Sequence, residues 1–390
     1  MKTQISDYVS AIPKSPFYKI GDYVRNLGLE NKVIYLNIGQ PRFDTPEHIR
    51  HAAMKAIEDG FTRYTPESGL LELRTAISSK LKRENNLDAD PEREIFVTSG
   101  AQAGLYVALK TILNPGDEVL IPSPFYPPYY AHTVLLGGKP VIIPYKMKDG
   151  FSLEPEDIER SITERTRVLF VHSPNNPTGG VLTEKNLKQI ADVAIKHNLV
   201  VLSDEPYESI LFDHAKHVSI SSLPEMKDRT VTLNSVSKTY SMTGWRIGFA
   251  VANDEFMKSF LKVHHAINIC SNSVAQKAAE AAYNGSHDFL KTWQNEYEQN
   301  RKIVSEGIKK SENLRLAFNA MGTFYCFLDI RGLGMSSEAA SEFMVREARV
   351  VTTPGSGFGD QGEGFLRISF ATSSEKLRAA LSNIISAVSK

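Results

Sequence analysis

The sequence predicts an α/β protein with a mostly parallel sheet and a second, smaller α+β domain, on the basis of three observations. Short apolar runs of β-type residues alternate with helical patterns through the middle of the chain. These runs are apolar on both faces, as strands buried in a parallel sheet are. The chain has 390 residues, which is too long for one ordinary core and indicates two domains.

Five strands are expected in the first domain, and each ends in a loop of polar residues. We place them at residues 94–98, 117–121, 167–172, 199–203 and 230–234, with a helix at 101–113 after the first. Ligands of open α/β sheets bind at the carboxyl ends of the strands. The loops that follow these strands are therefore the predicted site.

The second domain is expected after a long charged helix at residues 286–311. Strands at 324–330 and 364–370 and helices at 337–346 and 374–388 form a smaller α+β unit. We expect the large domain to span 46–288, and the small domain to combine 1–45 with 289–390.

The composition argues against several classes of function. Lys plus Arg and Asp plus Glu both number 45, so a net charge of zero gives no reason to expect nucleic acid or a membrane surface as partner. The N-terminus has no apolar signal core, and no run approaches about 18 apolar residues. We expect a cytoplasmic enzyme acting on a small molecule.

No metal site or disulfide framework is expected. The chain has two cysteines, Cys270 and Cys326, which lack a metal-binding spacing. His264 and His265 are adjacent, so their side chains would point in different directions.

Residues 357–362 fit the dinucleotide pattern G-x-G-x-x-G, but their context is wrong. That pattern needs a strand before it and a helix N-terminus after it to hold the pyrophosphate. The next residues, 364–370, have the pattern of a strand. We expect a tightly turned loop here and no dehydrogenase.

Three charged residues stand where isolated surface charges are not expected. Lys238 follows the fifth strand in the segment Ser235-Val236-Ser237-Lys238. Arg246 precedes an apolar run, so we expect it to be buried against an anion such as a phosphate. Arg367 lies within an apolar strand and suits a carboxylate partner.

Asp204 follows the fourth strand and has a simpler interpretation when it is considered alone. An aspartate after a strand is most often a helix N-cap. Tyr207, three residues later, and Lys238 downstream favour a role in chemistry instead.

These segments resemble the class I, fold type I pyridoxal-phosphate-dependent aminotransferases of the aspartate/aromatic type. The family pattern S-x-S-K, followed by an arginine and a glycine, matches 235–248. Residues 173–179 resemble its N-P-T-G loop and 204–207 its D-x-x-Y segment. The matching motifs span 37–370 in the family's order, and the resemblance implies a seven-stranded sheet flanked by helices.

The resemblance implies a role for each matching residue. Lys238 would hold pyridoxal 5'-phosphate as a Schiff base and act as general acid and base. Asp204 would pair with the pyridinium nitrogen, while Tyr207 and Asn176 would bind the phenolic oxygen. The other implied cofactor contacts are Gly100, Ala101, Gln102, Tyr126, Ser235, Ser237, Arg246 and, reaching the neighbouring subunit, Tyr64. Arg367, Gly39 and Asn176 would bind the substrate.

The implied activity is transfer of an amino group between an amino acid and a 2-oxo acid by a homodimer, with 2-oxoglutarate and glutamate as one pair. Aspartate, aromatic and small neutral donors all stay open. Alternatives on the same scaffold are a β-lyase or an aminocyclopropane-carboxylate-synthase-like enzyme. A non-catalytic cofactor-binding regulator would need a DNA-binding extension, for which the chain has no spare length or basic arm.

Overall fold

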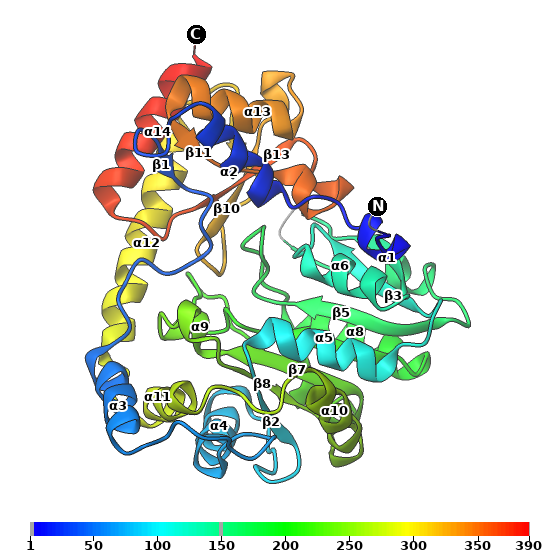
Figure 1. Ribbon diagram of the computed structural model, residues 1–390. Helices are drawn as coiled ribbons and strands as arrows, with labels where there is room; N and C mark the ends of the chain where they lie inside the picture. The colour runs from blue at the N-terminus through cyan, green and yellow to red at the C-terminus, as the bar shows by residue number, and fades with distance from the viewer. Residues whose placement is uncertain (1–3, 148–150, 390) are drawn as a thin grey trace.

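The computed structural model describes residues 4–147 and 151–389, which contain a seven-stranded sheet in the order β2-β8-β7-β6-β5-β3-β4 (Figure 1). Its strands are β2 (Ile95–Thr98), β3 (Glu118–Ser123), β4 (Lys139–Pro144), β5 (Thr166–His172), β6 (Val200–Asp204), β7 (Thr230–Ser235) and β8 (Gly248–Val251). β8 is antiparallel to β2 and β7, and the other pairs are parallel. The predicted α/β fold is confirmed.

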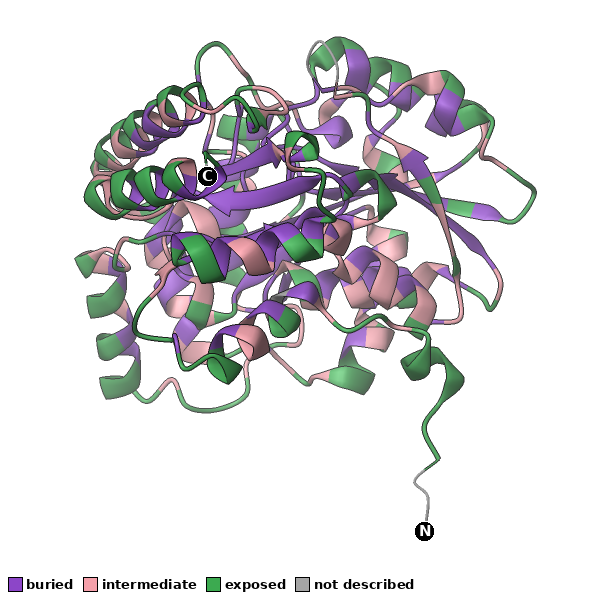
Figure 2. Ribbon diagram, turned by 90° about the horizontal axis from the view of Figure 1, so that it is seen from above, coloured by how far each residue is buried: buried purple, intermediate pink, exposed green. Residues whose placement is uncertain are grey.

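Helices cover both faces of this sheet, because alternate residues of each strand face opposite cores. Val168 and Phe170 of β5 pack with α5 (Ala101–Ile112), α6 (Pro128–Leu135) and α10 (Asp254–Ile267). Leu169 and Val171 pack with α7 (Pro155–Glu159) and α8 (Glu184–Lys196). Figure 2 shows the buried strands between layers of helix.

A third group of helices packs around β2 and β8. It comprises α3 (Glu47–Glu58), α4 (Leu71–Asn85) and α11 (Ser273–Asn284). In Figure 1 these helices lie at the end of the sheet farthest from the chain termini.

The smaller unit is built on an antiparallel sheet in the order β12-β13-β10-β9. Its strands are β9 (Arg315–Leu316), β10 (Tyr325–Asp329), β12 (Thr353–Pro354) and β13 (Phe365–Ser369). α13 (Ser337–Phe343) and α14 (Ser374–Val388) accompany it, and a π-helical turn over Met344–Ala348 follows α13. The predicted strands and helices of this region are confirmed.

We propose that the large domain spans residues 46–288 and that the small domain combines residues 1–45 and 289–390. Support comes from β1 (Ile34–Tyr35), which pairs in parallel with β11 (Val350–Val351) and so ties the N-terminal segment to the C-terminal one. Residues of α2 (Pro16–Asn26) also share a core with Val345 and Val351. α12 (Asp288–Ile308) leads from the large unit into the small one (Figure 1).

Two strands of the large sheet were not predicted. β4 lies at an edge with one buried residue of six, and β8 is a four-residue strand that runs antiparallel to its neighbours. The expectation of a loop at 357–362 is confirmed, since short 3-10 turns there lead into β13. Among the described residues, no helix is long and apolar enough to cross a membrane.

Candidate active site

A cavity of about 390 Å³ opens at the carboxyl ends of the parallel strands, where the smaller unit faces them. Its walls come from the loops after β5, β6 and β7, from the start of α5, and from β10 and β13. The lining residues are Asn37, Ile38, Gly39, Ala101, Gln102, Leu105, Tyr126, His172, Asn176, Asp204, Pro206, Tyr207, Ser235, Ser237, Lys238, Thr243, Arg246, Tyr325 and Arg367.

Lys238 reaches this cavity from the four-residue helix α9 (Val236–Thr239). Ser235 caps that helix, since its hydroxyl accepts a hydrogen bond of 2.9 Å from the backbone N–H of Ser237. The Nζ atom of Lys238 donates to the carbonyl of Gly39 at 2.6 Å. Burial, with the nearby charges of Arg367 and Arg246, lowers the pKa of Lys238 to about 8. A neutral, nucleophilic amine is therefore accessible near physiological pH.

Asp204 ends β6 and is almost fully buried. The hydroxyl of Tyr129 donates to its Oδ2 atom at 2.6 Å, and Nδ1 of His172 lies 2.8 Å from its backbone carbonyl. Oδ1 has no hydrogen-bond partner among the described residues. Burial raises the pKa of Asp204, while His172 and Tyr129 oppose that rise. A cationic N–H donor entering the cavity would satisfy Oδ1 and keep the carboxyl ionised.

Arg367, on β13, is 1% exposed and is contacted by residues of four other segments. Its Nη1 atom donates to Oδ1 of Asn176 at 3.0 Å, and its Nη2 atom donates to the carbonyl of Asn37 at 2.7 Å. The rings of Tyr325 and Phe358 lie 4.4 and 5.1 Å from its Cζ atom. A guanidinium held in this way suits a carboxylate ligand.

An anion cradle lies at the start of α5. Gly100 has φ +85°, and a Cβ atom there would come within 2.3 Å of Nη2 of Arg246, so the backbone approaches the guanidinium as only glycine allows. The backbone N–H groups at the start of α5, the hydroxyls of Ser235 and Ser237, and Arg246 suit a phosphate. The expectation that Arg246 is buried is wrong: its side chain is exposed, because the cavity is open there.

The remaining walls carry aromatic and amide groups. Tyr126 donates to Oε1 of Gln102 at 3.2 Å. The hydroxyl of Tyr207 lies 3.0 Å from that of Tyr325. Asn176 accepts from Arg367 through its oxygen, which leaves its NH₂ group as a donor.

The structure brings the sequence-predicted residues together, with two exceptions. Gly100 abuts Arg246 from just outside the cavity lining, and Tyr64 is 79% exposed, away from this cavity. Sequence reasoning missed Tyr129, His172 and Tyr325. None of the three gave a distinctive signal, although Tyr129 stands three residues after Tyr126 in Tyr126-Pro127-Pro128-Tyr129.

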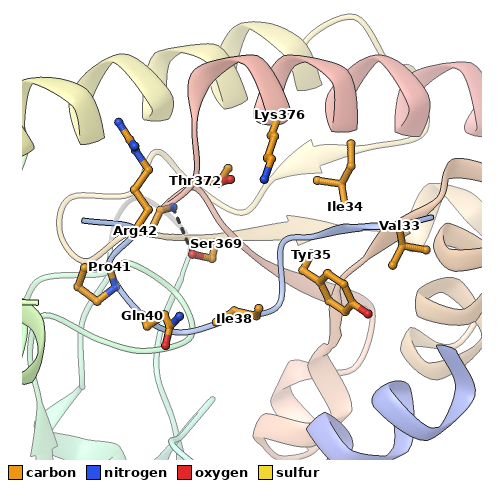
Figure 3. A pocket seen from close by; sticks show the side chains of 11 residues that line it. Val33, Ile34, Tyr35, Ile38, Gln40, Pro41, Arg42, Ser369, Thr372 and Lys376 are labelled. Carbon is orange, nitrogen blue, oxygen red and sulfur yellow. Dashed lines mark hydrogen bonds between the residues drawn. The ribbon is translucent and has the colours of Figure 1, made fainter. Parts of the chain in front are cut away.

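The segment 37–41 separates this cavity from a second hollow of about 330 Å³ on its outer side. Ile38 contributes to both, and Lys376 and Thr372 face the segment across the outer hollow (Figure 3). The outer hollow holds no counterpart of the Lys238 and Asp204 pair, which places the chemistry in the inner cavity.

Fold and site together define a class of enzyme. An amine with a lowered pKa, a buried carboxylate with one free oxygen and a cradle for an anion are what an aldehyde-bearing, phosphorylated pyridine cofactor requires. A buried arginine in the same cavity adds a grip for a carboxylate substrate.

Comparison with known proteins gives the family. The aminotransferase class I and II family model matches residues 31–384. Aromatic-amino-acid aminotransferase 2 of Thermococcus litoralis is 41% identical over 380 residues, which cover 97% of this chain and 96% of the relative. The aspartate aminotransferase of Pyrococcus abyssi is 40% identical over 380 residues, with the same coverage. The crystal structure of the aspartate aminotransferase from Rhizobium meliloti superimposes with a TM-score of 0.95 at 36% identity, covering 100% of this chain and 99% of that one.

The chain belongs to the class I and II aminotransferases and is a pyridoxal-5'-phosphate-dependent enzyme. The residues present fit that cofactor. Oδ1 of Asp204 is a buried acceptor without a partner among the described residues, and Gly100 leaves space beside Arg246 that a side chain would fill.

Proposed function

We propose that the enzyme moves an amino group between an α-amino acid and a 2-oxo acid, with glutamate and 2-oxoglutarate as one pair. The observation that supports this most is that Lys238, Asp204 and Arg367 line one cavity. When bound, the cofactor supplies an aldehyde that takes up the amino group and a cationic ring that accepts electrons.

Arg367 binds the substrate's α-carboxylate through two parallel hydrogen bonds. Its bonds to Asn176 and Asn37 fix the guanidinium before substrate arrives, so little ordering entropy remains to be lost. Gly39 lets its segment pack closely against Tyr325, because a Cβ atom there would come within 2.5 Å of the Tyr325 hydroxyl.

Lys238 would move a proton between the substrate's Cα and the cofactor's aldehyde carbon, away from Cα in the first half of the cycle and back to Cα in the second. Lys238 would hold the cofactor's aldehyde carbon in the resting enzyme, and as a free amine its pKa of about 8 suits proton transfer near neutral pH. Asp204 holds the proton on the ring nitrogen. Tyr207 and the NH₂ group of Asn176 donate to the ring oxygen.

The phosphate is held by Gly100, Ala101, Gln102, Ser235, Ser237 and Arg246, and Tyr126 covers the ring. We also propose a homodimer in which the partner subunit's Tyr64 reaches this phosphate. Support comes from the 79% exposure of Tyr64 and from further exposed apolar side chains, at Met54, Ile57, Leu71, Ile267 and Ile269.

For the amino donor we favour an uncharged, aromatic or neutral side chain. The cations that line the cavity are Lys238, Arg246 and Arg367, and each already has a role. Ile38, Leu105 and Tyr126 supply apolar wall. A relative named for aromatic amino acids and a relative named for aspartate have nearly the same sequence identity to this chain. Sequence identity alone therefore does not identify the amino donor.

A single half-reaction tests the function against a β-lyase or a cyclopropane-forming enzyme. Holoenzyme mixed with an aromatic amino acid and no oxo acid should release one 2-oxo acid per site and retain the amino nitrogen as pyridoxamine phosphate. The Lys238→Ala variant should lack both products, while Lys185→Ala, an exposed lysine on α8, should match the wild type. Release of ammonia without pyridoxamine phosphate would contradict transamination.

A further inference from the structure

Tyr325 has no assigned role, yet it contacts three residues of the site, Gly39, Tyr207 and Arg367. It begins β10, where it pairs with Ser369 of β13, and it is 1% exposed. Its hydroxyl lies against Gly39 and 3.0 Å from the hydroxyl of Tyr207. Its ring centroid lies 4.4 Å from Cζ of Arg367.

The direction of the bond between the two hydroxyls follows from counting protons. A phenol has one proton to donate. Under the proposed function, Tyr207 gives its proton to the cofactor's ring oxygen. Tyr325 must then donate to Tyr207, and donation to a hydroxyl strengthens that hydroxyl as a donor in turn.

The ring of Tyr325 has a separate effect. Together with Phe358, at 5.1 Å, it lies against the guanidinium of Arg367. Such cation–π contacts are strongest where water is excluded, and Arg367 is buried. The ring therefore fixes the plane in which Arg367 meets a carboxylate.

We propose that Tyr325 is a positioning residue with two separable actions: its hydroxyl reinforces the hydrogen bond of Tyr207 to the cofactor, and its ring orients Arg367 for the substrate. This inference rests on the proposed function of the same site.

Substitution by phenylalanine isolates the hydroxyl, because the ring stays. A hydrogen bond from Tyr207 to the cofactor's ring oxygen favours the ionised form of that oxygen. Tyr325→Phe should weaken this bond, so the pH at which the visible band of the bound cofactor titrates should rise. One neutral hydrogen bond corresponds to a shift of about 0.5 to 1 pH unit. We expect kcat to fall about fivefold and KM for the amino acid to stay near the wild-type value.

A double-mutant cycle tests whether Tyr325 acts through Tyr207. Tyr207→Phe should shift the titration further, and adding Tyr325→Phe to it should change nothing more. The matched control is Tyr297→Phe. Tyr297 is a buried tyrosine of α12 whose hydroxyl has no partner among the described residues, so the cofactor band of this variant should titrate at the wild-type pH. Two outcomes would overturn the role of the hydroxyl. In the first, the titration pH of Tyr325→Phe equals that of the wild type; in the second, the shift caused by Tyr325→Phe adds in full to the shift caused by Tyr207→Phe.

The ring is tested with Tyr325→Leu, which should raise KM for the amino acid about tenfold beyond the phenylalanine variant. Equal KM values in the two variants would overturn the role of the ring. A wild-type holoenzyme that shows no half-reaction would refute the proposed function instead, whatever the variants do. The two failures are therefore distinguishable.

Discussion

At the scale of single residues, the amine of Lys238 allows a prediction about pH. Burial and two nearby guanidinium groups lower its pKa to about 8, so the neutral form dominates above that pH. An exposed lysine loses its proton near pH 10.4. In cofactor-free protein, the rate at which formaldehyde and cyanoborohydride methylate Lys238 should therefore be half-maximal near pH 8.

Mass spectrometry of the peptide that contains Lys238, from pH 6 to 11, measures this rate. Lys185, exposed on α8, serves as the internal standard in the same digest. A midpoint for Lys238 that coincides with that of Lys185 would contradict the pKa and the burial that causes it.

Residues of the site differ in how far the sequence could predict them. Lys238, Asp204 and Arg367 stood out because a charge at the end of or within an apolar strand demands an explanation. Tyr325 and Tyr129 did not, because a tyrosine in an apolar segment looks like ordinary core. Only folding brings Tyr129 to Asp204 and Tyr325 to Tyr207.

At the scale of elements, a buried polar network fixes the segment that carries Asp204 and Tyr207. Lys80 of α4 forms an ion pair with Glu208, next to Tyr207. Asn85 donates to Oε2 of Glu208 at 2.7 Å, and Asn234 of β7 donates to Oε1 at 2.6 Å. Glu208 also lies near Glu205 and His217, in the one group of described residues close enough to hold a cation.

Removing the charge of Lys80 should destabilise the fold. Burial raises the pKa of Glu208, but Lys80, His217 and Asn85 outweigh it, and the net effect lowers that pKa. The stability that this provides is present above pH 4.5 and is lost as the pH falls. Lys80→Met leaves the carboxylate buried without its partner and should cost about 3–5 kcal/mol at neutral pH.

Thermal and urea denaturation at pH 7 and pH 4 would measure this cost. The variant should lose less stability than the wild type on acidification, because its Glu208 can take up a proton. Lys80→Met combined with Glu208→Gln should recover most of the loss, since glutamine stays neutral. A cost below about 1 kcal/mol for Lys80→Met, typical of surface pairs, would contradict the role of the network.

The strands also show which features of the fold the sequence pattern does not predict. The five buried parallel strands were predicted from their apolar runs, but the pattern does not give strand order or direction. β8 is inserted antiparallel between β2 and β7, and β4 completes an edge. Both depend on pairing between distant segments, which local periodicity does not encode.

At the scale of the whole molecule, the exposure of Tyr64 supports the proposed homodimer. It lies outside its own cavity and is 79% exposed, although the family resemblance gives it a phosphate contact. The chain also exposes apolar side chains on α3, at the end of α10 and on the loop after it, at Met54, Ile57, Ile267 and Ile269. A surface of this kind is typical of an interface between subunits.

Hybrid dimers test this arrangement. Suppose that each site combines Lys238 of one chain with the partner subunit's Tyr64. The Tyr64→Ala homodimer should then be defective at limiting cofactor, and the Lys238→Ala homodimer should be defective at any cofactor concentration. A dimer of one chain of each kind contains one site with both native residues and one site with neither. Refolding the two variants together should therefore restore up to half of the wild-type activity at limiting cofactor, measured on hybrids isolated through two different affinity tags. If Tyr64 served its own chain, no site in the hybrid would be intact, and its activity would not exceed that of the Tyr64→Ala protein.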